Sequence, residues 1–196
     1  MLRALFDKIA ALIGLLILSP LFLIIALAIV VDSRGGVFFI QTRVGKDFKP
    51  FGLYKFRTMR PFSESEGRLT VGNNDPRITR VGIHLRKYKL DELPQLINVV
   101  NGTMNLVGPR PEVPEYVEYY TEEQRKVLSV KPGITDYASL LYFNENEILA
   151  KSNNPKETYL NEVMPAKLKL NLEYMANKSF GEDLKIIFKT IGKIFG

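Results

Sequence analysis

The chain has 196 residues, 46% of them hydrophobic and 24% charged, so it is long enough to bury one core, and we expect one globular domain with appendages. The 27 lysines and arginines outnumber the 21 acidic residues, and the net charge of +6 favours an anionic partner such as nucleic acid, anionic lipid or a nucleotide diphosphate. The absence of cysteine excludes a disulfide framework and a thiolate metal site, and it permits a cytoplasmic catalytic domain.

The first feature along the chain is an uncharged, strongly apolar segment from Ile9 to Val31. As a straight helix it would be about 35 Å long, enough to cross a bilayer. It exceeds the ~7–15 apolar residues of a secretory signal peptide, so we reject that alternative. A single straight transmembrane helix is the second alternative.

Two observations favour a bent segment over a straight one. Ser19-Pro20 lies at the middle, where proline removes a helical hydrogen bond and clashes with the preceding turn. Both flanks are basic, and the positive-inside tendency then places both ends in the cytoplasm. We therefore predict a re-entrant, helix-break-helix membrane segment over residues 1–34, broken at Ser19 and Pro20, followed by a cytoplasmic catalytic domain over residues 35–196.

Residues 37–57 predict a β-hairpin. The first strand, residues 37–44, is rich in β-branched and aromatic side chains, and residues 51–57 return after a turn. Lys55 and Arg57 would share one strand face, where they are either solvated or in contact with substrate or lipid headgroups. Residues 61–74 are polar and rich in helix breakers, and they predict a mobile loop, either a lid or plain disorder.

The segment around Asp91 and Glu92 predicts a helix with two carboxylates in its first turn. Apolar residues recur at helical spacing, and Pro94 is tolerated only near a helix start. Neighbouring helical residues point about 100° apart, so the two carboxylates cannot flank a glycosidic bond. They suit a nucleophile beside a metal or an acid/base partner, although an ordinary N-terminal charge pair has the same pattern.

Positive charge gathers on both sides of this pair. A helix capped by Thr79 and ending at Lys87 would carry Arg86 just upstream. Downstream, Gly108-Pro109-Arg110-Pro111 is a rigid turn in which two prolines fix the backbone around one guanidinium, an arrangement suited to clamping phosphate.

Residues 179–195 predict an amphipathic helix. An apolar stripe that includes Leu184 and Ile191 lies beside a row of lysines at positions 185, 189 and 193. An interfacial helix on anionic lipid needs this pattern, and a helix packed against the core has the same one.

Five motifs, in order, carry a resemblance to a known family: residues 55–59, 75–82, 90–102, 106–112 and 131–135. The sequence resembles the bacterial sugar transferases, the small monotopic phosphoglycosyl transferases, also described as polyprenyl-phosphate sugar-1-phosphate transferases. The resemblance implies that a sugar 1-phosphate moves from a UDP-sugar to undecaprenyl phosphate with release of UMP. It also implies a covalent intermediate on the aspartate of an Asp-Glu dyad, in the first membrane step of a glycoconjugate pathway.

On this resemblance, Asp91 is expected to be the nucleophile. Glu92 is expected to hold a divalent metal, Mg²⁺, together with Asp91, or to handle protons. The residues expected to bind substrate are Arg57, Arg86, Pro109, Arg110 and Lys131. Some positions depart from the family pattern: Lys131 replaces a frequent arginine and Lys89 a frequent serine, while Thr103 and Asn105 replace the usual aspartate and serine.

The expected fold is α+β: a mostly helical catalytic domain with a small β-hairpin, a re-entrant N-terminal segment and an interfacial C-terminal helix. The protein would be monotopic, with its catalytic domain on the cytoplasmic face of the bacterial inner membrane. Its expected partners are a UDP-sugar, undecaprenyl phosphate and anionic membrane lipid, without nucleic acid; a homodimer is one arrangement left open. The alternative function is a non-catalytic, membrane-anchored basic scaffold that binds anionic lipid or nucleic acid, which would leave the ordered motifs without a purpose.

Overall fold

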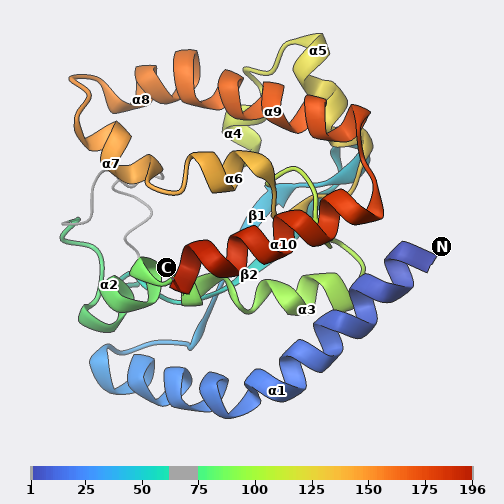
Figure 1. Cartoon of the computed structure of the whole chain (residues 1–196). Helices are drawn as coiled ribbons and strands as arrows, with labels where there is room; N and C mark the ends of the chain where they lie inside the picture. Colours follow the sequence, from blue (N-terminus) through green and yellow to red (C-terminus); the bar gives the residue numbers. More distant parts are fainter. Residues whose placement is uncertain (1, 62–74, 196) are drawn as a thin grey trace.

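The computed structural model describes residues 2–61 and 75–195, so the loop predicted over residues 61–74 lies almost wholly outside the described residues. The fold is mostly helical with two small sheets (Figure 1). In chain order the elements are α1 (Leu2–Asp32), β1 (Phe38–Val44), β2 (Pro50–Phe56), α2 (Arg80–Lys87), α3 (Gln95–Val100), β3 (Asn105–Val107), α4 (Pro114–Val117), α5 (Glu122–Arg125), β4 (Gly133–Thr135), α6 (Tyr137–Leu141), α7 (Glu145–Ala150), α8 (Pro155–Thr158), α9 (Met164–Ala176) and α10 (Phe180–Phe195).

Helix α1 is continuous, and it does not show the predicted break at Ser19 and Pro20. Proline removes one donor, the one that would bond the Leu16 carbonyl, and the Ser19 hydroxyl donates to that same carbonyl at 2.8 Å. The helix therefore stays hydrogen-bonded through its proline, while its axis changes direction along its length (Figure 1).

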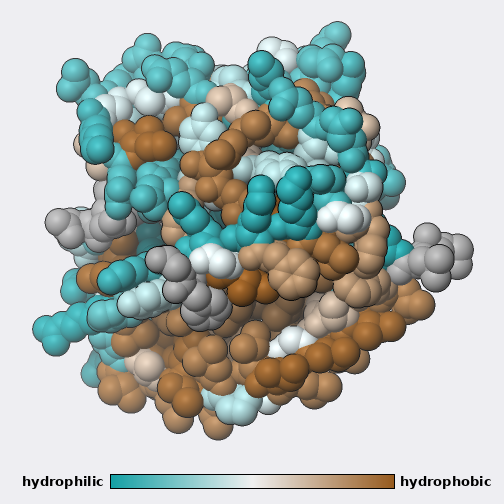
Figure 2. All heavy atoms as spheres, viewed as in Figure 1, coloured by the Kyte–Doolittle hydropathy of each residue, from teal (hydrophilic) through white to brown (hydrophobic). Residues whose placement is uncertain are grey.

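Most of the apolar surface of α1 is uncovered. Leu16 is 67% exposed and Val31 is 87% exposed. Figure 2 shows a largely apolar surface over the part of the molecule that α1 forms, whereas hydrophilic residues are much more frequent over the opposite part. Within the described ranges, α1 is the one helix that is long and apolar enough to cross a membrane.

The N-terminal end of α1 is fastened to the C-terminal helices. The Arg3 guanidinium donates a hydrogen bond to the Tyr174 hydroxyl at 2.7 Å and forms an ion pair with Asp183. Tyr174 in turn donates to the same aspartate at 2.5 Å, so one contact network joins α1, α9 and α10.

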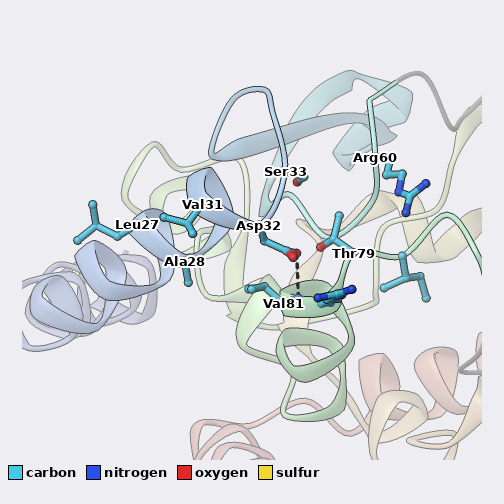
Figure 3. Close-up of a pocket in the computed structure, with 10 residues that line it drawn as sticks. Leu27, Ala28, Val31, Asp32, Ser33, Arg60, Thr79 and Val81 are labelled. Carbon is cyan, nitrogen blue, oxygen red and sulfur yellow. Dashed lines mark hydrogen bonds between the residues drawn. The ribbon is translucent and has the colours of Figure 1, made fainter.

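The other end of α1 is fastened to the hairpin and to α2. Arg57 donates to the backbone carbonyls of Ser33 at 2.8 Å and of Gly36 at 2.6 Å, which lie just past the end of the helix. The Asp32 carboxylate accepts a hydrogen bond from the Val81 amide at 3.0 Å (Figure 3). A hollow of about 800 Å³ lies here between α1 and the start of α2, away from Asp91 and Glu92.

The predicted hairpin is confirmed. Strands β1 and β2 pair antiparallel, with Phe38 opposite Phe56. Asn98 of α3 fixes the hairpin to the helix, because its buried side chain donates to the Gly52 carbonyl at 2.7 Å and accepts from the Tyr54 amide at 3.0 Å. The α3 helix and β2 thus form one unit beneath the dyad.

A second sheet, which the sequence did not indicate, pairs β3 with β4 in parallel. It brings Gly108 and Gly133 so close that a Cβ on Gly133 would lie 2.0 Å from the Gly108 amide nitrogen. Only glycine fits position 133, and this close approach sets where the turn at residues 108–111 begins.

The predicted C-terminal helix is confirmed as α10. Ile186 is fully buried against the neighbourhood of Val107 and Tyr174, whereas Phe188 is 68% exposed. The helix therefore packs on the domain with one face and leaves part of its apolar surface open.

Asn98→Ala should lower the free energy of unfolding by about 2–3 kcal/mol, because it leaves buried backbone groups of β2 without partners. Asn101→Ala, an exposed position directly after the same helix, is the matched control and should cost well under half as much. Unfolding midpoints in urea, measured in one detergent, compare the two. Equal losses would contradict the role assigned to Asn98.

Candidate active site

A cavity of about 650 Å³ opens beside Asp91 and Glu92. The hairpin, α2, the turn at residues 108–112 and helices α6, α9 and α10 all contribute to its walls. Side chains far apart in the sequence therefore meet around the two carboxylates.

The dyad lies in a short 3-10 turn, Leu90–Glu92, ahead of α3 rather than inside its first turn. Lys89 has a left-handed backbone with φ 55°, and Pro94 caps α3. The prediction of one helix through the dyad was wrong because proline starts α3 here, leaving residues 90–92 as a separate turn.

Glu92 is held by two cations. Arg110 binds it as a fork, donating from Nη1 to Oε2 at 2.9 Å and from Nη2 to Oε1, and Lys55 Nζ donates to Oε1 at 3.1 Å. Burial alone would raise the pKa of Glu92, but Arg110 and Lys55 outweigh it and hold that pKa well below its usual range. The charge of Glu92 in turn raises the pKa of Arg110. Glu92 and Arg110 therefore form an ionised pair, whereas burial lowers the pKa of Lys55 against the opposing charge of Glu92.

Asp91 has the opposite surroundings. Its side chain is 7% exposed, and among the described residues it accepts no hydrogen bond. Burial raises the pKa of Asp91 despite the opposing charge of Lys55. Burial of an ionised carboxylate that accepts no hydrogen bond costs desolvation free energy, and its oxygens are available to a ligand.

Arg86 completes the group. Its guanidinium donates to the Thr58 hydroxyl at 2.9 Å and lines the same cavity as the dyad. Thr79 caps the helix that carries it, accepting from the Gly82 amide, as the sequence predicted. Of the expected site residues, the structure therefore brings together Asp91, Glu92, Arg86 and Arg110.

The other expected substrate-binding residues lie outside the cavity lining. The guanidinium of Arg57 donates hydrogen bonds to backbone carbonyls within residues 33–36. These carbonyls have no helical donor because α1 has ended. Pro109 shapes the turn through its carbonyl, which accepts from the Gly133 amide at 3.1 Å. Lys131 extends toward Gly102 at the end of α3.

Sequence reasoning missed several residues that build the site. Lys55, noted only as a strand-face cation, touches Glu92 directly. Arg43 forms an ion pair with Glu112 at 3.1 Å, and the Asp136 carboxylate accepts from the Arg110 amide at 3.0 Å. Strand alternation places Lys55 and Arg43 on one hairpin face. That face is directed toward the dyad by the packing of the hairpin on α3, which strand alternation alone does not predict.

The donor set fits Mg²⁺ in part. Mg²⁺ in proteins is commonly bound by one or two carboxylates together with substrate phosphates. Asp91 offers unshared oxygens, whereas both oxygens of Glu92 already accept from cations. Within residues 2–61 and 75–195, no cluster of three or more acidic or histidine side chains is arranged to hold a metal.

A buried carboxylate with unshared oxygens and cations around it is chemically suited to phosphorylated ligands, and it lies in a protein with a large exposed apolar helix. The chain belongs to the bacterial sugar transferase family, whose sequence model matches residues 1–196.

Three similar proteins illustrate the range of the family. The UDP-glucose:undecaprenyl-phosphate glucose-1-phosphate transferase of Escherichia coli K12 is 38% identical over 96% of this chain and 39% of its own length. The UDP-N-acetylgalactosamine-undecaprenyl-phosphate N-acetylgalactosaminephosphotransferase of Aeromonas hydrophila is 37% identical over 96% and 42%. The exopolysaccharide production protein PSS of Rhizobium leguminosarum bv. phaseoli is 36% identical over 97% and 93%. The chain thus spans about two fifths of the first two proteins.

Asp91→Asn and Glu92→Gln should change stability in opposite directions at pH 7–8. Folding raises the pKa of Asp91, so its ionisation disfavours the fold above its ordinary pKa, and the amide should be as stable as wild type or more so. Folding lowers the pKa of Glu92, so its charge stabilises the fold above its ordinary pKa. Removing that charge leaves two buried cations and should cost about 3–5 kcal/mol. Denaturant unfolding of the two variants checks the signs; a loss of stability in Asp91→Asn comparable with that in Glu92→Gln would contradict this assignment.

Proposed function

We propose that the protein transfers a sugar 1-phosphate from a UDP-sugar to undecaprenyl phosphate and releases UMP. The observation that carries the proposal is Asp91: a buried carboxylate with unshared oxygens, surrounded by cations, in a chain of the bacterial sugar transferase family. Similar proteins named for glucose and for N-acetylgalactosamine match this chain almost equally, so the sugar stays open.

In the first step, a carboxylate oxygen of Asp91 attacks the β-phosphorus of the UDP-sugar. A P–O bond forms to Asp91, the P–O bond to the bridging oxygen breaks, and UMP leaves with that oxygen and its electron pair. Because the reacting atom is an ionised carboxylate, the step needs no proton removed from the nucleophile. Arg86 and Arg110 offset the charge of the two phosphates.

In the second step, a phosphate oxygen of undecaprenyl phosphate attacks the phosphorus of the sugar phosphate on Asp91. The bond to Asp91 breaks, and the carboxylate returns to its starting form. Glu92 does not react in either step; it holds Arg110 and Lys55 at the wall of the cavity. Arg57 and Pro109 act through the backbone that they fix.

Mg²⁺ would bind to Asp91 and to the phosphates of the nucleotide sugar, and it would withdraw negative charge from the reacting phosphates. Glu92 would be a further ligand only if Arg110 were bound to a phosphate instead. The charge of such an ion would help an anionic carboxylate to approach an anionic diphosphate.

Residues 1–34 would form a re-entrant membrane segment and residues 35–196 a catalytic domain on the cytoplasmic face of the bacterial inner membrane. Both ends of α1 are fastened to the same folded body, through Arg3 at one end and Arg57 at the other. A spanning helix would have to give up one of these attachments. The exposed apolar side chains of α10 would rest on the same leaflet, with anionic headgroups near its lysines.

Asp91→Asn should reduce UMP release by about 10³-fold or more, because an amide cannot form the acyl phosphate. The assay uses a panel of UDP-sugars with undecaprenyl phosphate. Asp47→Asn, an exposed turn position whose positive φ suits asparagine, is the matched control and should keep wild-type turnover. If the wild type released no UMP with any UDP-sugar, the basic-scaffold alternative would be favoured.

The role of Mg²⁺ is tested separately with excess EDTA, which should abolish turnover. Full turnover in excess EDTA would remove Mg²⁺ from the mechanism.

The re-entrant topology predicts that both ends of α1 face the cytoplasm. Because the natural chain has no cysteine, Ala4→Cys and Gly36→Cys each supply one unique thiol. An impermeant maleimide should label both from the cytoplasmic side of vesicles and neither from the periplasmic side, like Glu123→Cys on the exposed surface of α5. Periplasmic labelling at position 4 would mean that α1 spans the membrane.

A further inference from the structure

Two lysine side chains from distant elements meet at one aromatic ring on the wall of the cavity. Phe143 follows α6 and lines the cavity. Lys89 Nζ, from the segment just before the dyad, lies 5.1 Å from the centroid of the Phe143 ring. Lys193 Nζ, from α10, lies 5.8 Å from the same centroid. One ring therefore binds an ammonium group from each of two distant elements, beside the turn that carries Asp91.

These two ammonium groups form no direct ion pair of the kind that other cations of the cavity form, within the part of the chain that the structure describes. Lys55 and Arg110 pair with Glu92, and Lys167 pairs with Glu145. Across residues 2–61 and 75–195, Lys89 and Lys193 form no hydrogen bond or ion pair through their side chains. Lys89 also feels the charges of Asp91 and Glu92, but without a direct ion pair. Two cations that share one aromatic ring and form no ion pair favour the arrival of an anion.

The position of Lys193 connects the cavity with the apolar surface. Ile194, its neighbour on α10, lines the cavity, while Phe188 and Ile191 of the same helix are exposed. Figure 2 shows hydrophilic residues along α10, directly bordering the apolar part of the molecule. An anion with an apolar tail could therefore reach the cavity from this border, with the tail on the α1 and α10 side and the head toward Lys89 and Asp91.

We propose that Lys89 and Lys193, held by Phe143, form the docking site for the phosphate of the polyprenyl phosphate, ready for its attack on the sugar phosphate carried by Asp91. This inference rests on the function proposed above. The ion pair with phosphate is stronger than the contact with the ring, so both lysines leave Phe143 when the phosphate binds. Arg86 and Arg110 then serve the nucleotide sugar, and the two lysines serve the acceptor.

The proposal predicts that the two half-reactions respond differently to substitution. Lys89→Gln and Lys193→Gln should each raise the KM for undecaprenyl phosphate by about tenfold, and the double variant should raise it further. The formation of the sugar-phosphate adduct from UDP-sugar alone should stay within about twofold of wild type, because the acceptor takes no part in it. Lys185→Gln, on the same lysine row of α10 but paired with Glu182, is the matched control and should leave both half-reactions unchanged.

The full chain in nanodiscs is assayed for both half-reactions, and its binding to vesicles separates a specific acceptor site from general attraction to headgroups. The double variant should bind less well than wild type to phosphatidylcholine vesicles that contain a small fraction of undecaprenyl phosphate. It should bind to vesicles that contain phosphatidylglycerol as well as the Lys185→Gln variant does. An unchanged KM in the double variant, an equal loss of adduct formation, or an equal loss of binding to phosphatidylglycerol would each overturn the proposal. A wild-type chain that forms no adduct would instead contradict the proposed function itself.

Discussion

The structure depends on the ion cluster in which Arg110 and Lys55 hold Glu92. The cluster joins the hairpin, the dyad turn and the proline-flanked turn, and it fixes a guanidinium and an ammonium at one wall of the cavity. It also satisfies one carboxylate of the dyad so completely that the other, Asp91, is left without hydrogen bonds within the described ranges. Two neighbouring acids thus acquire opposite properties: Glu92 stays ionised and structural, and Asp91 stays open to a ligand.

Helix α1 and the site are joined by a continuous series of hydrogen bonds. Arg57, just past β2, binds the chain that leaves α1, and Asn98 ties the same strand to α3, whose preceding turn carries the dyad. The position of Asp91 relative to the apolar surface is therefore set by short, partly buried hydrogen bonds rather than by a flexible linker. The proposed transfer of a sugar phosphate from a water-soluble nucleotide sugar to a lipid phosphate would need this fixed position, because both substrates would have to reach the same carboxylate.

Local patterns predicted the elements well and their contacts poorly. The Thr79 cap, the hairpin and α10 follow from capping and periodicity, and the Ser19 hydroxyl bonds the carbonyl that Pro20 leaves free. Arg57 and Arg110 look alike as motif cations, yet one holds backbone carbonyls and the other holds Glu92. Nothing local separates these roles, since they depend on residues more than 15 positions away. The break predicted at Pro20 is absent from α1 because the hydroxyl of Ser19 replaces the backbone donor that proline lacks.

The central claim is that Asp91 carries the sugar phosphate, and intact-protein mass spectrometry tests it most directly. The full chain is incubated with its UDP-sugar and Mg²⁺, without acceptor, and is then quenched and digested. The account predicts a mass increase of one sugar phosphate per chain, located on the peptide with Asp91, together with one equivalent of UMP and loss of the label when undecaprenyl phosphate is added. UMP release that requires the acceptor and leaves no label on Asp91 would contradict it.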